Sequence, residues 1–223
     1  MYLIPFEYGV FRRISKFLAA FILLAVPATA ETVRIVALGD SLTAGYGLQT
    51  EDGFVPRLQA FLDDKNVDAM IVNAGVSGDT SAGGLERVNW ALQGEVHGMI
   101  LALGANDMLR GFSPKLTKEN LSQIIEIAIE KDIDVLLVGV EATQNFGPTY
   151  KASFDALYAE LEATYGVPLY DNFLGAISRD RTIEEMRPYL QPDGLHPNVK
   201  GVQMIVDEIG WPVMGLIDGM DHW

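Results

Sequence analysis

The chain has 223 residues, of which 49% are hydrophobic and 21% charged, and this balance excludes a disordered, collagen-like or coiled-coil protein. It contains no cysteine, which excludes disulfides, thiol nucleophiles, Fe–S clusters and cysteine-ligated zinc. The formal net charge of −14 disfavours binding to nucleic acid or anionic lipid, because an acidic surface repels phosphate groups.

Residues 1–30 have the pattern of a secretory signal peptide. Basic side chains precede an apolar run over 17–26, and Ala28 and Ala30 form an A-x-A cleavage site. The run is about half as long as the roughly 20 residues that a membrane-spanning helix needs. We therefore expect cleavage after Ala30, a periplasmic or secreted location, and no stable membrane insertion of the mature protein. Cleavage leaves 13 basic and 29 acidic residues, a net charge of −16.

From residue 31 onward, strand-like apolar runs alternate with amphipathic helical segments. In chain order, the predicted elements are a strand at 33–38, a helix at 54–64, a strand at 69–72, a helix through 85–90, a strand at 99–103, a helix around 121–129, a strand at 135–140, a helix at 150–165, a strand at 167–170 and a helix around 202–209. The strands are continuous apolar runs, which indicates that both faces of the sheet are covered. We expect one domain over 31–223: an α/β protein, a three-layer α/β/α sandwich of flavodoxin-like shape with a five-stranded parallel sheet.

The segment around 121–129 has the clearest helical pattern. Its apolar residues recur at i, i+3, i+4, i+7 and i+8, which is typical of a helix with one buried face. We expect all five residues to face the core: Leu121, Ile124, Ile125, Ala128 and Ile129.

Polar, glycine-rich segments follow the first three predicted strands, and a fourth precedes the last helix. They are Gly39-Asp-Ser-Leu42, the loop 73–80, Gly104-Ala-Asn-Asp107 and Pro192-Asp-Gly-Leu-His-Pro197. In parallel sheets, functional groups gather at the carboxyl ends of the strands. These segments therefore predict a site at that edge.

His196 is the candidate base, because Asp193 lies three residues before it in a loop made tight by Gly194 and two prolines. This spacing lets the carboxylate accept a hydrogen bond from one imidazole nitrogen and leaves the other nitrogen to take a proton. Taken alone, the pattern also fits a loop-stabilising hydrogen bond or part of a metal site. We expect His97 to be a solvated surface residue and His222 to lie in a frayed tail.

Ser41 is the candidate nucleophile, because it follows a buried strand through a glycine turn. A serine at the start of a helix is also an ordinary N-cap. The segment has neither the G-x-S-x-G elbow nor a phosphate-binding or dinucleotide-binding glycine pattern. Three groups could donate hydrogen bonds to an oxyanion: the backbone N–H of Ser41, that of Gly78, and the side-chain amide of Asn106. Gly78 and Asn106 also fit ordinary turn chemistry.

Together the four segments resemble the SGNH (GDSL) hydrolase family, which is named for Ser, Gly, Asn and His in four blocks. The resemblance extends over essentially the whole mature chain and is strongest to the branch of bacterial periplasmic thioesterase I, lysophospholipase L1 and arylesterase, through residues 37–46, 78–80, 106–112 and 166–170. It implies Ser41 as nucleophile, His196 as base and Asp193 as its orienter, with Ser41, Gly78 and Asn106 forming the oxyanion hole.

Two positions depart from the pattern of that branch. Ala105 replaces the usual glycine, which costs little unless the backbone there needs a positive φ. The segment 141–147 lacks the apolar, proline-rich run that helps to line the acyl groove in relatives, so the acyl chain length is left open.

We expect a serine esterase that hydrolyses acyl esters or thioesters, of arylesterase, lysophospholipase or acyl-CoA thioesterase type, through an acyl-enzyme intermediate. We expect no cofactor and no metal ion, a small-molecule substrate, no nucleic-acid partner and a monomer. Two alternatives remain open: a carbohydrate O-deacetylase on the same scaffold, and a non-catalytic periplasmic binding module.

Overall fold

The computed structural model describes residues 32–220, so the expected signal peptide and His222 lie outside the described residues. The strands form one parallel sheet in the order β2-β1-β3-β4-β5. Their bounds are β1 (Val33–Gly39), β2 (Ala69–Gly75), β3 (Gly98–Ala102), β4 (Asp134–Val138) and β5 (Leu169–Tyr170). The predicted five-stranded parallel sheet is confirmed.

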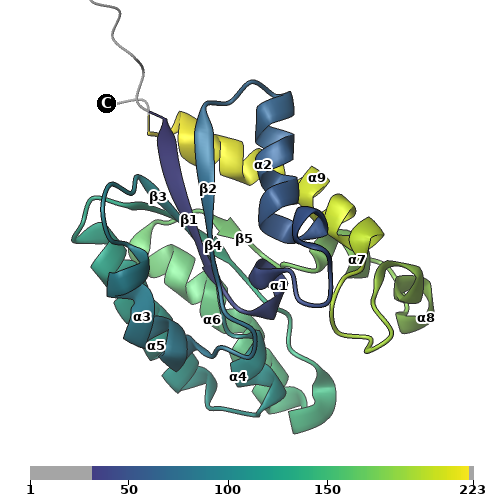
Figure 1. Cartoon of the computed structure of the whole chain (residues 1–223). Helices are drawn as coiled ribbons and strands as arrows, with labels where there is room; N and C mark the ends of the chain where they lie inside the picture. The colour runs from purple at the N-terminus through teal and green to yellow at the C-terminus, as the bar shows by residue number, and fades with distance from the viewer. Residues whose placement is uncertain (1–31, 221–223) are drawn as a thin grey trace, which may run out of the picture. The chain divides into compact units, whose positions relative to one another are not determined.

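Helices cover both faces of this sheet (Figure 1). The α-helices are α1 (Ser41–Ala44), α2 (Phe54–Asp64), α3 (Ser81–Ala91), α4 (Ala105–Leu109), α5 (Pro114–Ile129), α6 (Pro148–Tyr165), α7 (Gly175–Ser178), α8 (Ile183–Met186) and α9 (Val199–Asp218), and the 3₁₀ turns are η1 (Thr50–Asp52), η2 (Gln144–Phe146) and η3 (Arg187–Tyr189). Helices α3, α5 and α6 pack on one face, and α2, α7 and α9 on the other. No helix within 32–220 combines the length and apolarity that crossing a membrane requires.

Strand β1 shows why the apolar runs are continuous. Successive side chains of a strand point to opposite faces. Ile35 and Ala37 accordingly join the core under α2 and α9, whereas Val36 and Leu38 join the core under α3, α5 and α6. All four are fully buried, so both sets of positions favour apolar side chains.

The main differences from the predicted elements are at their ends. Strand β2 runs on to Gly75, because residues 73–75 pair with 37–39 of β1. In α5, Ile129 is 46% exposed, so its predicted place in the core was wrong. At 3.6 residues per turn, Ile129 lies about 80° around the helix from Leu121, at the edge of the buried face.

Candidate active site

The end of β1 presents Ser41 without using its hydroxyl as a cap. Asp40 is the N-cap of α1, and its Oδ1 accepts a hydrogen bond from the N–H of Leu42 at 2.9 Å. Ser41 is therefore the first residue of α1, and its side chain stays available. Gly39 makes the close turn possible, because a Cβ there would lie 2.0 Å from Oγ1 of Thr43.

The structure brings Ser41, His196 and Asp193 into one hydrogen-bonded chain. His196 Nε2 lies 2.9 Å from Ser41 Oγ across 155 residues of sequence. His196 Nδ1 lies 2.6 Å from Asp193 Oδ2. A carboxylate on Nδ1 fixes that nitrogen as the donor, so Nε2 faces the hydroxyl as an acceptor. Serine, imidazole and carboxylate in this order can activate the hydroxyl as a nucleophile.

The loop before α9 holds Asp193 in its ionised form. Desolvation opposes ionisation, but the carboxylate accepts the N–H groups of Leu195 at 2.9 Å and His196 at 3.1 Å as well as the imidazole contact. These hydrogen bonds outweigh the desolvation and lower the pKa of Asp193 to about 2. The carboxylate therefore keeps its negative charge at neutral and mildly acidic pH.

Gly78 and Asn106 lie on two segments that are joined by a hydrogen bond, and Asn106 also contacts the residue before Ser41. Gly78 has φ of 81°, and its carbonyl accepts from Arg110, which is the C-cap of α4. Asn106 is the second residue of α4, and its Nδ2 donates to Asp40 Oδ2 at 3.3 Å. An amide carries two N–H groups, so one remains for another acceptor.

Ala105 fits its position without strain. The positive φ of this turn, 118°, falls on Gly104, and Ala105 begins α4. A Cβ on Gly104 would lie 2.2 Å from the hydroxyl of Tyr158, so glycine is required one residue earlier. The methyl group of Ala105 therefore leaves the backbone of Asn106 undisturbed.

Asp40 is a buried carboxyl group between the proposed nucleophile and Asn106. It is 1% exposed, and burial raises its pKa from 3.8 to about 6, although the Leu42 N–H, the charge of His196 and the Asn106 amide act in the other direction. The sequence alone does not single out Asp40, because a serine and an aspartate are equally good N-caps. Its position lets it orient the Asn106 amide.

Arg87 is a second residue that the sequence analysis missed. From α3 it donates Nε to Asp79 Oδ2 at 2.7 Å, Nη1 to the Ala74 carbonyl at 2.7 Å and Nη2 to the Gly39 carbonyl at 2.9 Å. The guanidinium thereby joins the ends of β1 and β2 to the loop that carries Gly78. No local sequence pattern signals this, because the partners lie up to 48 residues away.

A buried polar network anchors α4 to α3 and α5. Asp107, 2% exposed, accepts from the N–H of Ser81 at 2.8 Å and from its hydroxyl at 2.5 Å. Thr117 donates to the same carboxylate at 3.3 Å, and Asn120 donates to Ser81 at 2.9 Å. These contacts tie α3, α4 and α5 together and fix the turn on which Asn106 sits.

His97 lies at the opposite, amino-terminal edge of the sheet, but it is not simply a solvated surface residue. Its side chain is 13% exposed, and Nδ1 accepts the N–H of Arg34 at 3.0 Å. The expected solvated state was therefore wrong, because the ring completes the hydrogen bonding at the start of β1.

The loop after β4 is tied to α6 by polar contacts. Asp155 accepts the N–H of Ala142 at 2.7 Å, and Lys151 binds Glu141 and Asp155 at 2.8 Å each. Phe146 of η2 is 47% exposed and packs over Gly111, at the end of the Asn106 segment. The loop lacks an apolar run, but it brings one aromatic side chain against Gly111, at the end of the segment that contains Asn106.

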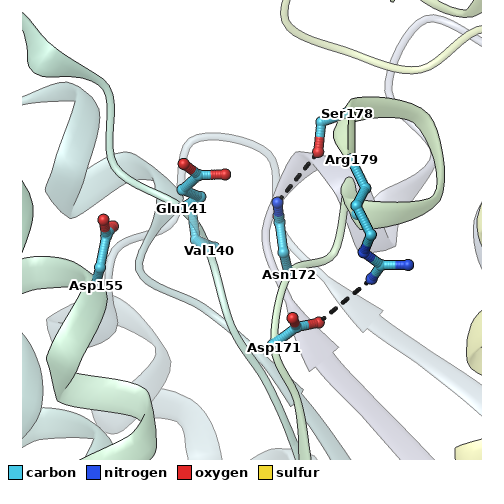
Figure 2. A pocket seen from close by; sticks show the side chains of 8 residues that line it. Val140, Glu141, Asp155, Asp171, Asn172, Ser178 and Arg179 are labelled. Atoms are coloured by element: carbon cyan, nitrogen blue, oxygen red, sulfur yellow. Dashed lines mark hydrogen bonds and ion pairs between the residues drawn. The ribbon is translucent and has the colours of Figure 1, made fainter. Parts of the chain in front are cut away.

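A cavity of about 290 Å³ lies elsewhere, between this loop and the segment after β5 (Figure 2). Its polar side chains are satisfied by one another or by close neighbours: Asn172 by Ser178 at 3.3 Å, Arg179 by Glu208 at 2.9 Å and Asp171 at 3.7 Å, and Glu141 and Asp155 by Lys151. Within residues 32–220, no group of three or more His, Asp or Glu side chains could hold a metal ion.

Comparison with known proteins gives consistent matches. The chain matches the GDSL-like Lipase/Acylhydrolase family over residues 37–204, which include all four segments of the site. It is 35% identical over 196 residues to Esterase TesA of Pseudomonas aeruginosa, covering 87% of this chain and 93% of that protein. It is 34% identical over 213 residues to thioesterase 1/protease 1/lysophospholipase L1 of Escherichia coli (strain K12), covering 94% and 96%.

Solved structures agree with these relatives. A crystal structure of TesA has a TM-score of 0.74 at 34% identity and covers 82% of this chain and 99% of its own. The psychrotrophic esterase EstA from Pseudoalteromonas sp., in a structure inhibited by monoethylphosphonate, has a TM-score of 0.76 at 32% identity, with coverage of 83% and 98%.

Proposed function

The chain belongs to the GDSL-like lipase/acylhydrolase family and is an esterase, and we propose that Ser41, His196 and Asp193 carry out the hydrolysis of a small-molecule acyl ester or thioester. The observation that supports this most directly is the hydrogen-bonded chain of 2.9 Å and 2.6 Å that joins these three side chains.

In the first step, Ser41 Oγ attacks the acyl carbon while His196 Nε2 takes the hydroxyl proton. The ionised carboxylate of Asp193 stabilises the imidazolium that forms. Because its pKa is low, the carboxylate does not take up the proton itself. The tetrahedral intermediate then collapses: its bond to the alcohol or thiol breaks, and His196 gives the proton to that leaving group. Ser41 is left acylated.

The negative charge on the tetrahedral oxygen needs donors that are in place beforehand. Ser41 occupies the first position of α1, where a backbone N–H has no acceptor within the helix. We assign the other two donors to the N–H of Gly78 and the amide of Asn106. Arg110 and Asp40 hold these two residues, at the Gly78 carbonyl and the Asn106 Nδ2.

In the second step, water replaces the serine as nucleophile. His196 takes a proton from the water, the hydroxide adds to the acyl carbon, and the second tetrahedral intermediate releases the carboxylic acid as Ser41 recovers its proton. All steps use groups of this chain and water, so we propose that no cofactor or metal ion takes part.

The surface of the segments that carry the site supports an apolar acyl group. Exposed apolar side chains on these segments, within a few residues of them, or in the loop after β4 include Tyr46, Leu109, Phe112, Phe146 and Leu195. An acyl chain can cover such side chains, at about 25 cal/mol per Å² of apolar area removed from water. A series of p-nitrophenyl and CoA esters of increasing chain length, run beside an acetylated sugar, separates an acyl esterase from an O-deacetylase.

Covalent labelling with a fluorophosphonate tests the proposal. The wild-type protein should lose its activity as one residue is labelled, and Ser41→Ala should neither label nor turn over substrate. Ser153→Ala, at an exposed position on α6, is the matched control and should behave as wild type. Labelling that persists in Ser41→Ala would overturn the assignment of the nucleophile.

Location and assembly are also part of the proposal. The pattern of residues 1–30 supports export to the periplasm or beyond and cleavage after Ala30. The mature net charge of −16 supports a monomer that does not bind nucleic acid. N-terminal sequencing of the exported protein and its sedimentation mass test these points.

A further inference from the structure

Tyr46 packs against the proposed base although it is 52% exposed. Its ring centroid lies 4.7 Å from that of His196, and the two planes are tilted by 40°. This separation is within the range in which an aromatic ring attracts a cation over its face. The contact is made by a residue outside the serine, carboxylate and oxyanion groups already described.

The backbone of Tyr46 is fixed from both sides of the site. Its N–H donates to the carbonyl of Ser41 at 3.1 Å. Its own carbonyl accepts from Gln191 Nε2 at 2.7 Å, and the same amide donates to the carbonyl of Pro197 at 3.0 Å. Tyr46 thus connects the residue of the nucleophile with the loop of the base.

The backbone turn that follows Tyr46 requires a glycine at position 47. Its φ is 75°, and a Cβ there would lie 2.3 Å from the side-chain oxygen of Gln191. The backbone therefore turns sharply after Tyr46 and lets Gln191 reach across. The tyrosine ring is held in place by these backbone contacts rather than by burial of its side chain.

We propose that Tyr46 is a positioning residue that holds the imidazole of His196 in line with Ser41 and stabilises the imidazolium form through its aromatic face. This inference rests on the proposed role of His196 as the base. The imidazolium exists in each tetrahedral intermediate, so a ring that attracts it acts on both steps. The negative face of the ring, not its hydroxyl, makes the contribution.

Among the described residues, two carboxylates, those of Asp193 and Asp40, are the charged groups that act on His196. Asp193 lies on its own loop at 2.6 Å, and Asp40 of the β1–α1 turn interacts with it through charge. The remaining neighbours in the small cleft between the two loops are apolar or neutral: Ser41, Leu42, Gly45, Leu48, Pro197 and Val202. Burial raises the pKa of Asp40 to about 6, so the pH dependence of the rate alone does not report on the imidazole, and its protonation is followed separately.

The test compares Tyr46→Leu with Tyr46→Phe in the mature protein, using kcat/KM for a neutral p-nitrophenyl ester from pH 5 to 9. Tyr46→Leu should lower the plateau about two- to fivefold and move the acid limb to lower pH by about half a unit, because the imidazolium loses its aromatic partner. Tyr46→Phe should restore the position of the limb. Trp90→Leu removes a 70% exposed aromatic ring near the end of α3 and should match wild type.

Imidazole titration by NMR in the Ser41→Ala background provides a readout that does not depend on turnover. The His196 signal, identified by its absence in His196→Ala, should titrate at lower pH with leucine at position 46 than with phenylalanine. Coinciding titrations, or a slower enzyme with an unmoved acid limb, would overturn the proposal, because loosening of the loop alone gives that result. If the wild type is neither labelled nor active, it is the proposed function that fails.

Discussion

Replacing Asp40 by asparagine should make the protein more stable and less active at neutral pH. The carboxyl group is 1% exposed, and burial raises its pKa from 3.8 to about 6. A rise of about two pKa units corresponds to about 3 kcal/mol. Because the folded state binds this proton more tightly than the unfolded state, the contribution to stability is fully present below pH 4 and is lost as the pH rises through 6.

The asparagine variant lacks this titration. The amide oxygen of the asparagine can still accept the hydrogen bond from the N–H of Leu42. The oxygen that accepts from Asn106 is replaced by an NH₂ group, and the loss of this hydrogen bond lowers the stability by about 1 kcal/mol. At pH 7 the variant should therefore be about 2 kcal/mol more stable than wild type. Near pH 4 this advantage should disappear. The NH₂ groups of Asn106 and of the new asparagine are both donors, so we expect the Asn106 side chain to turn away. The value of kcat should then fall by up to about 10²-fold, which approaches the effect of removing one oxyanion donor.

Urea unfolding at pH 4, 5, 6 and 7 measures the first effect, and hydrolysis of a neutral aryl ester at pH 8 measures the second. Asp68→Asn, at an exposed position, controls for the removal of one negative charge. The quantity to follow is the difference in unfolding free energy between variant and wild type, since other groups titrate in both. A difference that does not widen from pH 4 to pH 7 refutes the reasoning.

Other substitutions test the remaining contacts. Ser41→Ala and His196→Ala should each abolish nearly all turnover, and the double variant should be scarcely slower, because the two side chains act as a unit; an additive double variant would contradict this. His97→Ala should keep kcat but lose about 1 kcal/mol of stability in urea unfolding, since it leaves a backbone N–H without its acceptor. Arg87→Met should cost about 3 kcal/mol, because it leaves the 11% exposed carboxylate of Asp79 unpaired; a change under 1 kcal/mol would show that the pair contributes little. EDTA should leave the rate unchanged, and loss of activity restored by zinc would argue against the serine mechanism.

Much of the fold could be predicted because its signals are local. Continuous apolar strands separated by amphipathic helices require a parallel sheet covered on both faces, and the turn after each strand then lies at one edge. The pairing of Ser41 with His196 is implied by the resemblance of the four segments to the SGNH family, because the loop of His196 precedes the last helix and does not follow a strand. Their chemical roles remain a prediction.

The supporting contacts could not be predicted, because they depend on how separate elements meet. The carboxylate of Asp107 reaches Ser81 across 26 residues, and Arg87 reaches the carbonyl of Gly39 across 48. Neither pair has a characteristic spacing. Whether Asp40 or Ser41 caps α1 is likewise decided by the backbone at the end of β1, which the residue types alone do not determine.

An aspartate lies next to Ser41, Gly78 and Asn106 in the sequence, and another lies three residues before His196; each one accepts hydrogen bonds from a different part of the site. Asp40, before Ser41, orients the Asn106 amide; Asp79, after Gly78, holds Arg87; Asp107, after Asn106, holds the start of α3; and Asp193 holds His196. A carboxylate can accept several hydrogen bonds at once, and these are stronger than bonds between neutral groups. Burying such a group lowers stability, as the raised pKa of Asp40 indicates. In the mechanism that we propose, this arrangement favours donors that are already in position when the oxyanion forms, at the expense of the most stable fold.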